Sequence, residues 1–112
     1  MKIIIHSVNI ELTPAIKSFA EKKIGSLAKF LKPDSDSIEA KVEIGKPSRH
    51  HKSGFVYYAE VNLKIGKKLI RASSRHNDLY TAINDVRDEI EVQVKKFKEK
   101  IGKTVRRQAT EK

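Results

Sequence analysis

Apolar residues recur along nearly the whole chain, but their spacing changes from one segment to the next. Residues 2–8 are rich in β-branched side chains and predict a strand. In segments 38–44 and 55–65 every second residue faces the same side, the period of a half-buried strand. Residues 66–67 then predict a tight turn into a further strand over 69–73. The sequence therefore predicts four strands, the last three in an antiparallel meander.

Two other segments carry apolar residues at steps of three and four, the period of an amphipathic helix. The first helix is expected to begin at Thr13 and the proline that follows it, because the hydroxyl can cap free N–H groups and proline lacks one. It should end near Lys32. The second helix should be capped by Asn77 or Asp78 and end at Gly102. The apolar stripes are Ile16, Phe19, Ala20, Ile24, Leu27 and Leu31 in the first helix, and Leu79, Ile83, Val86, Ile90, Val94, Phe97 and Ile101 in the second.

This order, β-α-β-β-β-α, predicts an α+β fold in which two helices pack on one face of a four-stranded sheet. Because the first helix joins two strands, a crossover should place the first strand parallel to its neighbour. We expect a single domain over residues 1–101. Residues 102–112 have no core to join and are expected to form a basic, disordered C-terminal tail.

The composition argues against several classes of protein. The chain has no cysteine, and its N-terminal apolar run is too short for a signal peptide or a membrane span. His50 and His51 have no acidic partner at metal-ligand spacing, and the scattered glycines form no phosphate-binding loop. No set of nucleophile, base and oxyanion donors can be assembled. We therefore expect a cytoplasmic, non-enzymatic protein, monomeric when free, with no metal, cofactor, membrane or small-molecule substrate.

The net charge of +10 is unevenly distributed along the chain. Residues 1–76 carry +8, residues 77–91 carry −4 and residues 92–112 carry +6. Within the second helix the acidic residues come first and the basic residues last, an order that complements the helix dipole. The cations beyond the end of this helix are not needed for that purpose. Basic strips on two neighbouring helices would form a groove that focuses positive potential and favours folded RNA. With only three tyrosines, the sequence shows no paired aromatic platform for stacking single-stranded bases.

Three short segments carry a resemblance to a known family. They are residues 10–16 (IELTPAI), 59–61 (AEV) and, above all, 78–84 (DLYTAIN), which is followed at the expected distance by Gln93-Val94-x-Lys96. Through them the first hundred residues resemble the ribosome-hibernation factors, the short hibernation-promoting factor and the ribosome-associated inhibitor. The resemblance implies the same order of strands and helices, similar to a double-stranded-RNA-binding domain with an extra strand.

The resemblance also implies a partner and a mode of action. The domain would bind the small ribosomal subunit, and so the whole ribosome, near the decoding centre. There it would block the sites of messenger RNA and transfer RNA and silence translation without chemistry. Basic side chains of both helices would contact ribosomal RNA, with one further candidate just before the second helix. The rRNA-binding candidates are Lys22, Lys23, Lys29, Arg75, Arg87, Lys95, Lys96, Lys98 and Lys100.

Two alternatives stay open. The element order alone also fits a generic double-stranded-RNA-binding module. A sigma-factor-modulating protein is the second alternative, with the acidic stretch 78–91 as its contact surface. The resemblance is to the short forms of the family, since long forms carry an additional dimerising domain. Promotion or prevention of ribosome dimers, and truncation from a longer form, stay undecided at this point.

Overall fold

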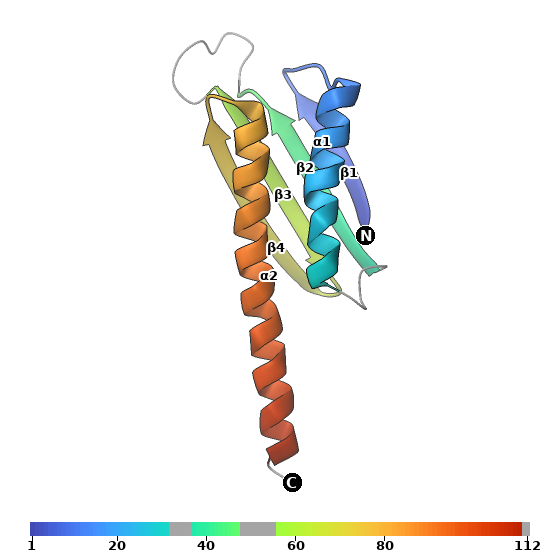
Figure 1. Cartoon of the computed structure of the whole chain (residues 1–112), viewed down its shortest axis with the longest axis vertical. Coiled ribbons are helices and arrows are strands. Elements are labelled where there is room, and N and C mark those ends of the chain that lie inside the picture. The colour runs from blue at the N-terminus through green and yellow to red at the C-terminus, as the bar shows by residue number, and fades with distance from the viewer. Residues whose placement is uncertain (32–36, 48–55, 111–112) are drawn as a thin grey trace.

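The computed structural model describes residues 1–31, 37–47 and 56–110, with side chains up to residue 99. The predicted α+β class and the β-α-β-β-β-α order are confirmed. In Figure 1 the two helices lie side by side across one face of the sheet. The elements are β1 (Lys2–Val8), α1 (Pro14–Gly25), a short 3-10 helix η1 (Ser26–Phe30), β2 (Ile38–Gly45), β3 (Tyr57–Ile65), β4 (Lys68–His76) and α2 (Leu79–Thr110).

The sheet has the strand order β1-β2-β3-β4. β1 is parallel to β2, as predicted for a strand–helix–strand crossover, and the other neighbours are antiparallel. Gly66 lies in the turn between β3 and β4 with a left-handed φ of 58°, a conformation that favours glycine. The register places Ala40, Leu63 and Ile70 next to one another across three strands, and all three are buried. The strands therefore present one continuous apolar face.

The core fills the space between that face and the two helices. Both predicted apolar stripes supply it, and the side chains of Ile24, Ile83 and Ile90 are fully buried. Phe97 is only partly buried, and the side chain of Ile101 lies outside the described ones. No charged or polar side chain is buried within the described part of the chain. The strands and α2 thus follow the predicted hydrophobic pattern.

The first helix differs from the prediction at its C-terminal end. It begins as expected, with the Thr13 hydroxyl accepting from the Ile16 N–H at 3.2 Å, but the α-helix ends at Gly25. The chain continues as η1 to Phe30, whereas we expected one helix as far as Lys32, which is not among the described residues. The Ser26 hydroxyl donates to the Lys23 carbonyl at 2.6 Å, a local bond that competes with regular helix continuation.

The second helix also differs at its end. Asp78 caps it, because the Asp78 carboxylate accepts from the N–H and the hydroxyl of Thr81 at 3.2 and 2.7 Å. The helical backbone does not end at Gly102, as we expected, but continues to Thr110. A single glycine within a helix costs only about 1 kcal/mol relative to alanine, so it does not by itself end the helix. The division into a domain and a tail at residue 101 stays a prediction.

The continuation of α2 makes the molecule elongated, with principal extents of 62 × 25 × 19 Å. In Figure 1 the C-terminal part of α2 projects beyond the end of the sheet. None of the helices in the described ranges is long and apolar enough to cross a membrane. The predicted basic loop over 45–54, including His50 and His51, lies outside the described residues from position 48 onward.

Candidate nucleic-acid interface

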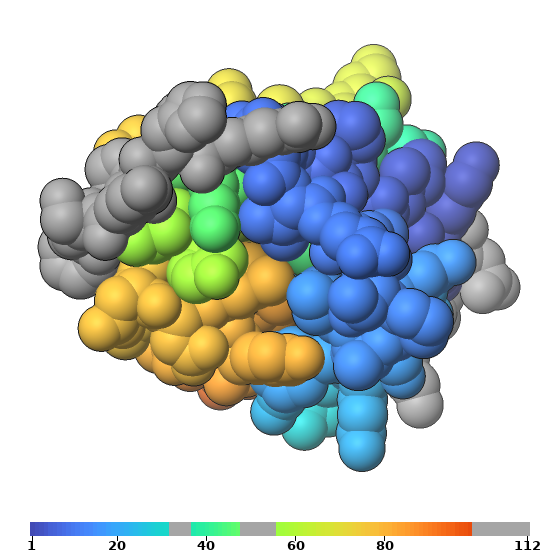
Figure 2. All heavy atoms as spheres, turned by 90° about the horizontal axis from the view of Figure 1, so that it is seen from above, coloured from blue at the N-terminus to red at the C-terminus, as the bar shows by residue number. Residues whose placement is uncertain are grey.

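A basic groove lies between the α1–η1 segment and α2. Its volume is about 540 Å³, and it opens to solvent. Figure 2 views the molecule from the end where both helices begin, with α1 in blue next to α2 in orange. Four of the seven lining residues are cationic and one is a carboxylate, which gives the groove a positive potential. The lining residues are Lys22, Lys23, Ser26, Lys29, Asn84, Arg87 and Asp88.

Arg87 connects the two walls of this groove through a hydrogen bond to η1 and ion pairs within α2. Its side chain is only 13% exposed, and its Nε donates to the Ser26 hydroxyl of η1 at 3.0 Å. Its Nη1 pairs with the carboxylate of Glu91 at 2.5 Å and with that of Asp88 at 3.3 Å. Bonds from Arg87 first, and then from Lys95 at 3.2 Å, hold the pKa of the Glu91 carboxyl below its ordinary value. Arg87 therefore serves the helix–helix joint, and its charge is largely compensated within the protein.

Phe30 is the centre of a cluster of cations that the sequence pattern did not reveal. Three cations approach its ring: the Nζ atoms of Lys29 and Lys95 lie 5.1 and 5.0 Å from the centroid, and the Arg87 guanidinium carbon lies at 5.9 Å. Cation–π attraction at such distances favours a fixed arrangement of the charges. No spacing rule could have revealed the cluster, because its members come from two separate elements.

The groove is bordered by an aromatic pair near the start of both helices. The rings of Phe19 and Tyr80 meet edge to face, with centroids 4.7 Å apart and an interplanar angle of 81°. The Nζ of Lys23 lies 5.6 Å from the centroid of Phe19. The chain of contacts from Lys23 through Phe19 to Tyr80 thus links the basic groove to the beginning of α2.

The remaining rRNA-binding candidates lie on different faces of the molecule. Lys98 is exposed and follows Arg87 by eleven residues, about three helical turns, so it lies on the same side of α2. Lys96 instead lines a hollow on the β4 side of the helix. Arg75 is exposed on β4, where it pairs in register with Tyr58 on the uncovered face of the sheet. The Lys100 side chain lies outside the described ones.

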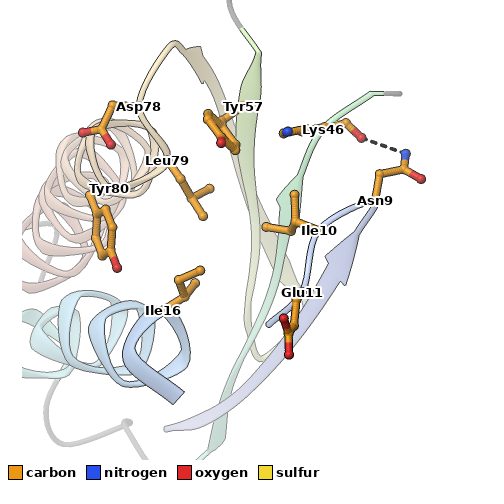
Figure 3. A pocket seen from close by; sticks show the side chains of 9 residues that line it. All are labelled: Asn9, Ile10, Glu11, Ile16, Lys46, Tyr57, Asp78, Leu79 and Tyr80. Carbon is orange, nitrogen blue, oxygen red and sulfur yellow. Dashed lines mark hydrogen bonds between the residues drawn. The ribbon is translucent and has the colours of Figure 1, made fainter. Parts of the chain in front are cut away.

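A second pocket, of about 410 Å³, lies where the starts of α1, β3 and α2 meet the ends of β1 and β2. Two of the three tyrosines, Tyr57 and Tyr80, line it, as Figure 3 shows. The expectation that the chain lacks a paired aromatic platform for stacking single-stranded bases stays a prediction. The two tyrosines lie on different elements, so the sequence alone did not bring them together.

Comparison with known proteins supports one family. The family model described as "Sigma 54 modulation protein / S30EA ribosomal protein" matches residues 3–102. The chain is 31% identical over 108 residues to the ribosome hibernation promotion factor of Bacillus subtilis (strain 168), covering 96% of this chain and 54% of that protein. It is 30% identical over 102 residues to the factor of the same name from Staphylococcus aureus (strain COL), covering 91% and 50%. The chain spans about half the length of these curated relatives.

Two solved structures share the fold. The N-terminal domain of Thermus thermophilus Protein Y superimposes with a TM-score of 0.70 and 29% identity, covering 87% of this chain and 99% of that one. A ribosomal subunit interface protein from Coxiella burnetii gives a TM-score of 0.71 at 20% identity, covering 88% and 99%, and this likeness concerns the fold alone. The matched residues include α1, the four strands apart from the first residue of β1, and α2 as far as residue 102, and with them the basic groove between the helices. The chain therefore belongs to the sigma 54 modulation protein / S30EA ribosomal protein family.

Proposed function

We propose that this chain is a ribosome hibernation factor that binds the small ribosomal subunit near the decoding centre. Bound there, it would occupy the sites of messenger RNA and transfer RNA and so silence translation by exclusion, without chemistry. Family membership and two relatives named as ribosome hibernation promotion factors support this assignment. The partner is the ribosome, and the contact surface is the basic groove between α1 and α2.

The arrangement of charges in that groove is the observation that supports the proposal most directly. No ion pair within the described part of the chain involves Lys22, Lys23 or Lys29, so their charges are available for phosphates. Two of them lie against aromatic rings, which restricts their motion. Each cation that neutralises a phosphate releases a counterion, so binding to ribosomal RNA should be strong and steeply dependent on salt.

Sedimentation with purified ribosomes tests the proposal. At about 100 mM salt, where phosphate contacts are still strong, the protein should travel with small subunits and with whole ribosomes. Its addition should also reduce the binding of messenger and transfer RNA to those ribosomes. A protein that stays at the top of the gradient under these conditions would contradict the assignment. The same gradients, scored for ribosome pairs, would show whether the chain promotes or prevents dimers.

Competition separates the proposal from a generic double-stranded-RNA-binding module. A ribosome-specific factor should keep its position on ribosomes when free duplex RNA is added in mass excess over ribosomal RNA. A generic module would be displaced, because it reads only the shape and the backbone of a duplex. Displacement in proportion to added duplex would therefore favour the module.

A further inference from the structure

The pocket shown in Figure 3 is built by tertiary contacts at one end of the sheet. Asn9 adopts a left-handed φ of 59° and donates from Nδ2 to the Lys46 carbonyl at 2.9 Å. The Lys46 N–H donates to the Val8 carbonyl at 3.0 Å, which holds the ends of β1 and β2 together. The Lys46 ammonium lies 5.2 Å from the centroid of Tyr57. One side of the pocket is thus held by hydrogen bonds and by a cation over an aromatic ring.

The lining of this pocket combines flat apolar surface with a few polar groups. In Figure 3 the side chains of Ile10, Ile16, Leu79 and Tyr80 surround the same space, and Tyr57 lies beside it. The space is within the size range of small-ligand pockets. Aromatic and aliphatic faces of this kind accept the flat surface of a nucleobase, and they do so for any base, because every base has a π-face.

The electrostatics disfavour a bare phosphate as the occupant. The N-terminus of α2 would ordinarily attract an anion, but the carboxylate of Asp78 already occupies it through its bonds to Thr81. Glu11 contributes a second carboxylate to the lining. Among the lining residues that the structure describes, Lys46 is the single cation, so one phosphate next to the pocket could be neutralised while the interior takes an uncharged group.

The pocket is also connected to the basic groove. Tyr80 lines the pocket and contacts Phe19, whose ring lies below the ammonium of Lys23, a lining residue of the groove. An RNA strand whose phosphates follow the groove would therefore reach the pocket at the end where both helices begin.

We propose that this pocket receives one unstacked base of the RNA bound along the groove, with Tyr57 and Tyr80 providing the stacking surface and Lys46 neutralising the neighbouring phosphate. The inference rests on the proposed function, which names the RNA as ribosomal, and it adds a contact to a base to the contacts with the backbone. Such a contact would add sequence information, because phosphate contacts position a protein on the RNA but do not read its bases.

Two footprints on ribosomes saturated with the protein test this inference. Hydroxyl-radical cleavage reports the RNA backbone covered by the groove, whereas dimethyl sulfate and carbodiimide report individual base edges. The wild-type protein should protect a backbone region and at least one unpaired base next to it. Tyr57→Leu should keep the backbone footprint and lose the protection of that base. Its affinity should fall roughly tenfold, within the range of one missing base–aromatic stack.

Tyr58→Leu is the matched control, because Tyr58 is the next residue of the same strand. Its hydroxyl donates to Glu43 at 2.9 Å, and its side chain lies on the uncovered face of the sheet, away from the pocket. This variant should protect the base like the wild type. Ile10→Trp, which fills the pocket from its loop, should reproduce the loss seen with Tyr57→Leu and provides a second variant if that one unfolds.

The outcomes distinguish the base pocket from the proposed function on which it rests. A backbone footprint with base protections that are identical in the wild type, Tyr57→Leu and Ile10→Trp would overturn the base pocket and leave the proposed function intact. A cross-link from a photoreactive residue at position 80 to a ribosomal protein instead of RNA would also overturn it. A wild-type protein that leaves no backbone footprint would refute the proposed function, and the base pocket with it.

Discussion

Gly45 ends β2 directly against the backbone of β1. A Cβ atom at this position would lie 2.0 Å from the Val8 carbonyl oxygen, an overlap that only a shift of the backbone can relieve. Gly45→Ala should therefore lower the free energy of unfolding by about 1–3 kcal/mol, as overpacking of a tight site usually does. Urea denaturation followed by circular dichroism measures this change.

Gly25 provides the matched control for that substitution. A Cβ there would meet the nearest atom, Cδ1 of Ile3, at an ordinary 3.7 Å, and the backbone is helical. Gly25→Ala should leave the stability unchanged or raise it by up to about 1 kcal/mol, because alanine favours the helix more than glycine does. Equal destabilisation by both substitutions would show that the contact with Val8 is not the cause.

Asp78 makes the stability of the fold dependent on acidity. The hydrogen bond from the Thr81 hydroxyl is the first cause that lowers the pKa of Asp78 from its ordinary value of 3.8. Since the folded-state pKa is the lower one, the unfolded chain binds this proton first as the pH falls. The stabilisation is therefore complete above the ordinary value and is lost as the pH falls through the folded-state pKa.

Asp78→Asn tests this dependence, because asparagine also caps helices but does not titrate. The stability difference between the wild type and this variant should be constant near neutral pH and should shift in favour of the variant below pH 3.8. Urea denaturation at a series of pH values measures it. A difference that does not change with pH would mean that the Asp78 carboxylate has the same pKa in both states.

At the scale of elements, the joint between η1 and α2 depends on Arg87. Arg87→Met keeps the aliphatic stem but removes the bonds to Ser26 and Glu91, and should destabilise the fold by about 2 kcal/mol, the usual range for bonds that involve a charged group. Asp88→Asn should have almost no effect, because the Asp88 carboxylate is 72% exposed and such surface pairs contribute little. Chemical denaturation of the two variants compares them, and equal losses would contradict this role of Arg87.

The basic strip of α1 and η1 should determine much of the salt dependence. Replacing Lys22, Lys23 and Lys29 together by alanine should weaken ribosome binding and reduce the slope of log K against log salt by up to about three, roughly one for each lysine that pairs with a phosphate. Replacing Lys41, Lys64 and Lys67, which are exposed on the uncovered face and in the β3–β4 turn, provides the control. Equilibrium binding at four or five salt concentrations gives both slopes, and equal slopes would remove the groove lysines from the interface.

Prediction of the elements succeeded where one residue pattern determines burial. The alternation in β2 and β3 and the stripe of α2 identify the buried side chains, because strand and helix periods place residues on fixed faces. It failed where a local side chain intervenes, as Ser26 does at the end of α1. The sequence could not show which side chains share a site, because Phe30 and Lys95 meet only through the packing of separate elements. For the same reason it could not show that Lys96 and Arg75 face away from the groove, and their role in binding RNA stays a prediction.

At the scale of the whole molecule, the charge is organised by layer. The helix side carries the basic groove, whereas the uncovered sheet face mixes cations with the carboxylates of Glu39, Glu43 and Glu60. On that face Arg71 pairs with Glu60 at 3.2 Å. A polyanion approaching the helix side therefore meets a concentrated group of cations in the groove, beside the exposed carboxylates near the start of α2.

The C-terminal part of α2 should contribute to binding without contributing to the fold. Among the side chains of α2 that the structure describes, the last fully buried one is Val94, and Phe97 is partly buried. Deletion of residues 102–112 should consequently leave the midpoint of urea unfolding unchanged. The deleted segment carries a net charge of +3, so ribosome binding should weaken and its salt slope should fall by up to about three. A lower unfolding midpoint would place part of this segment within the domain, and an unchanged slope would show that its charges do not contact RNA.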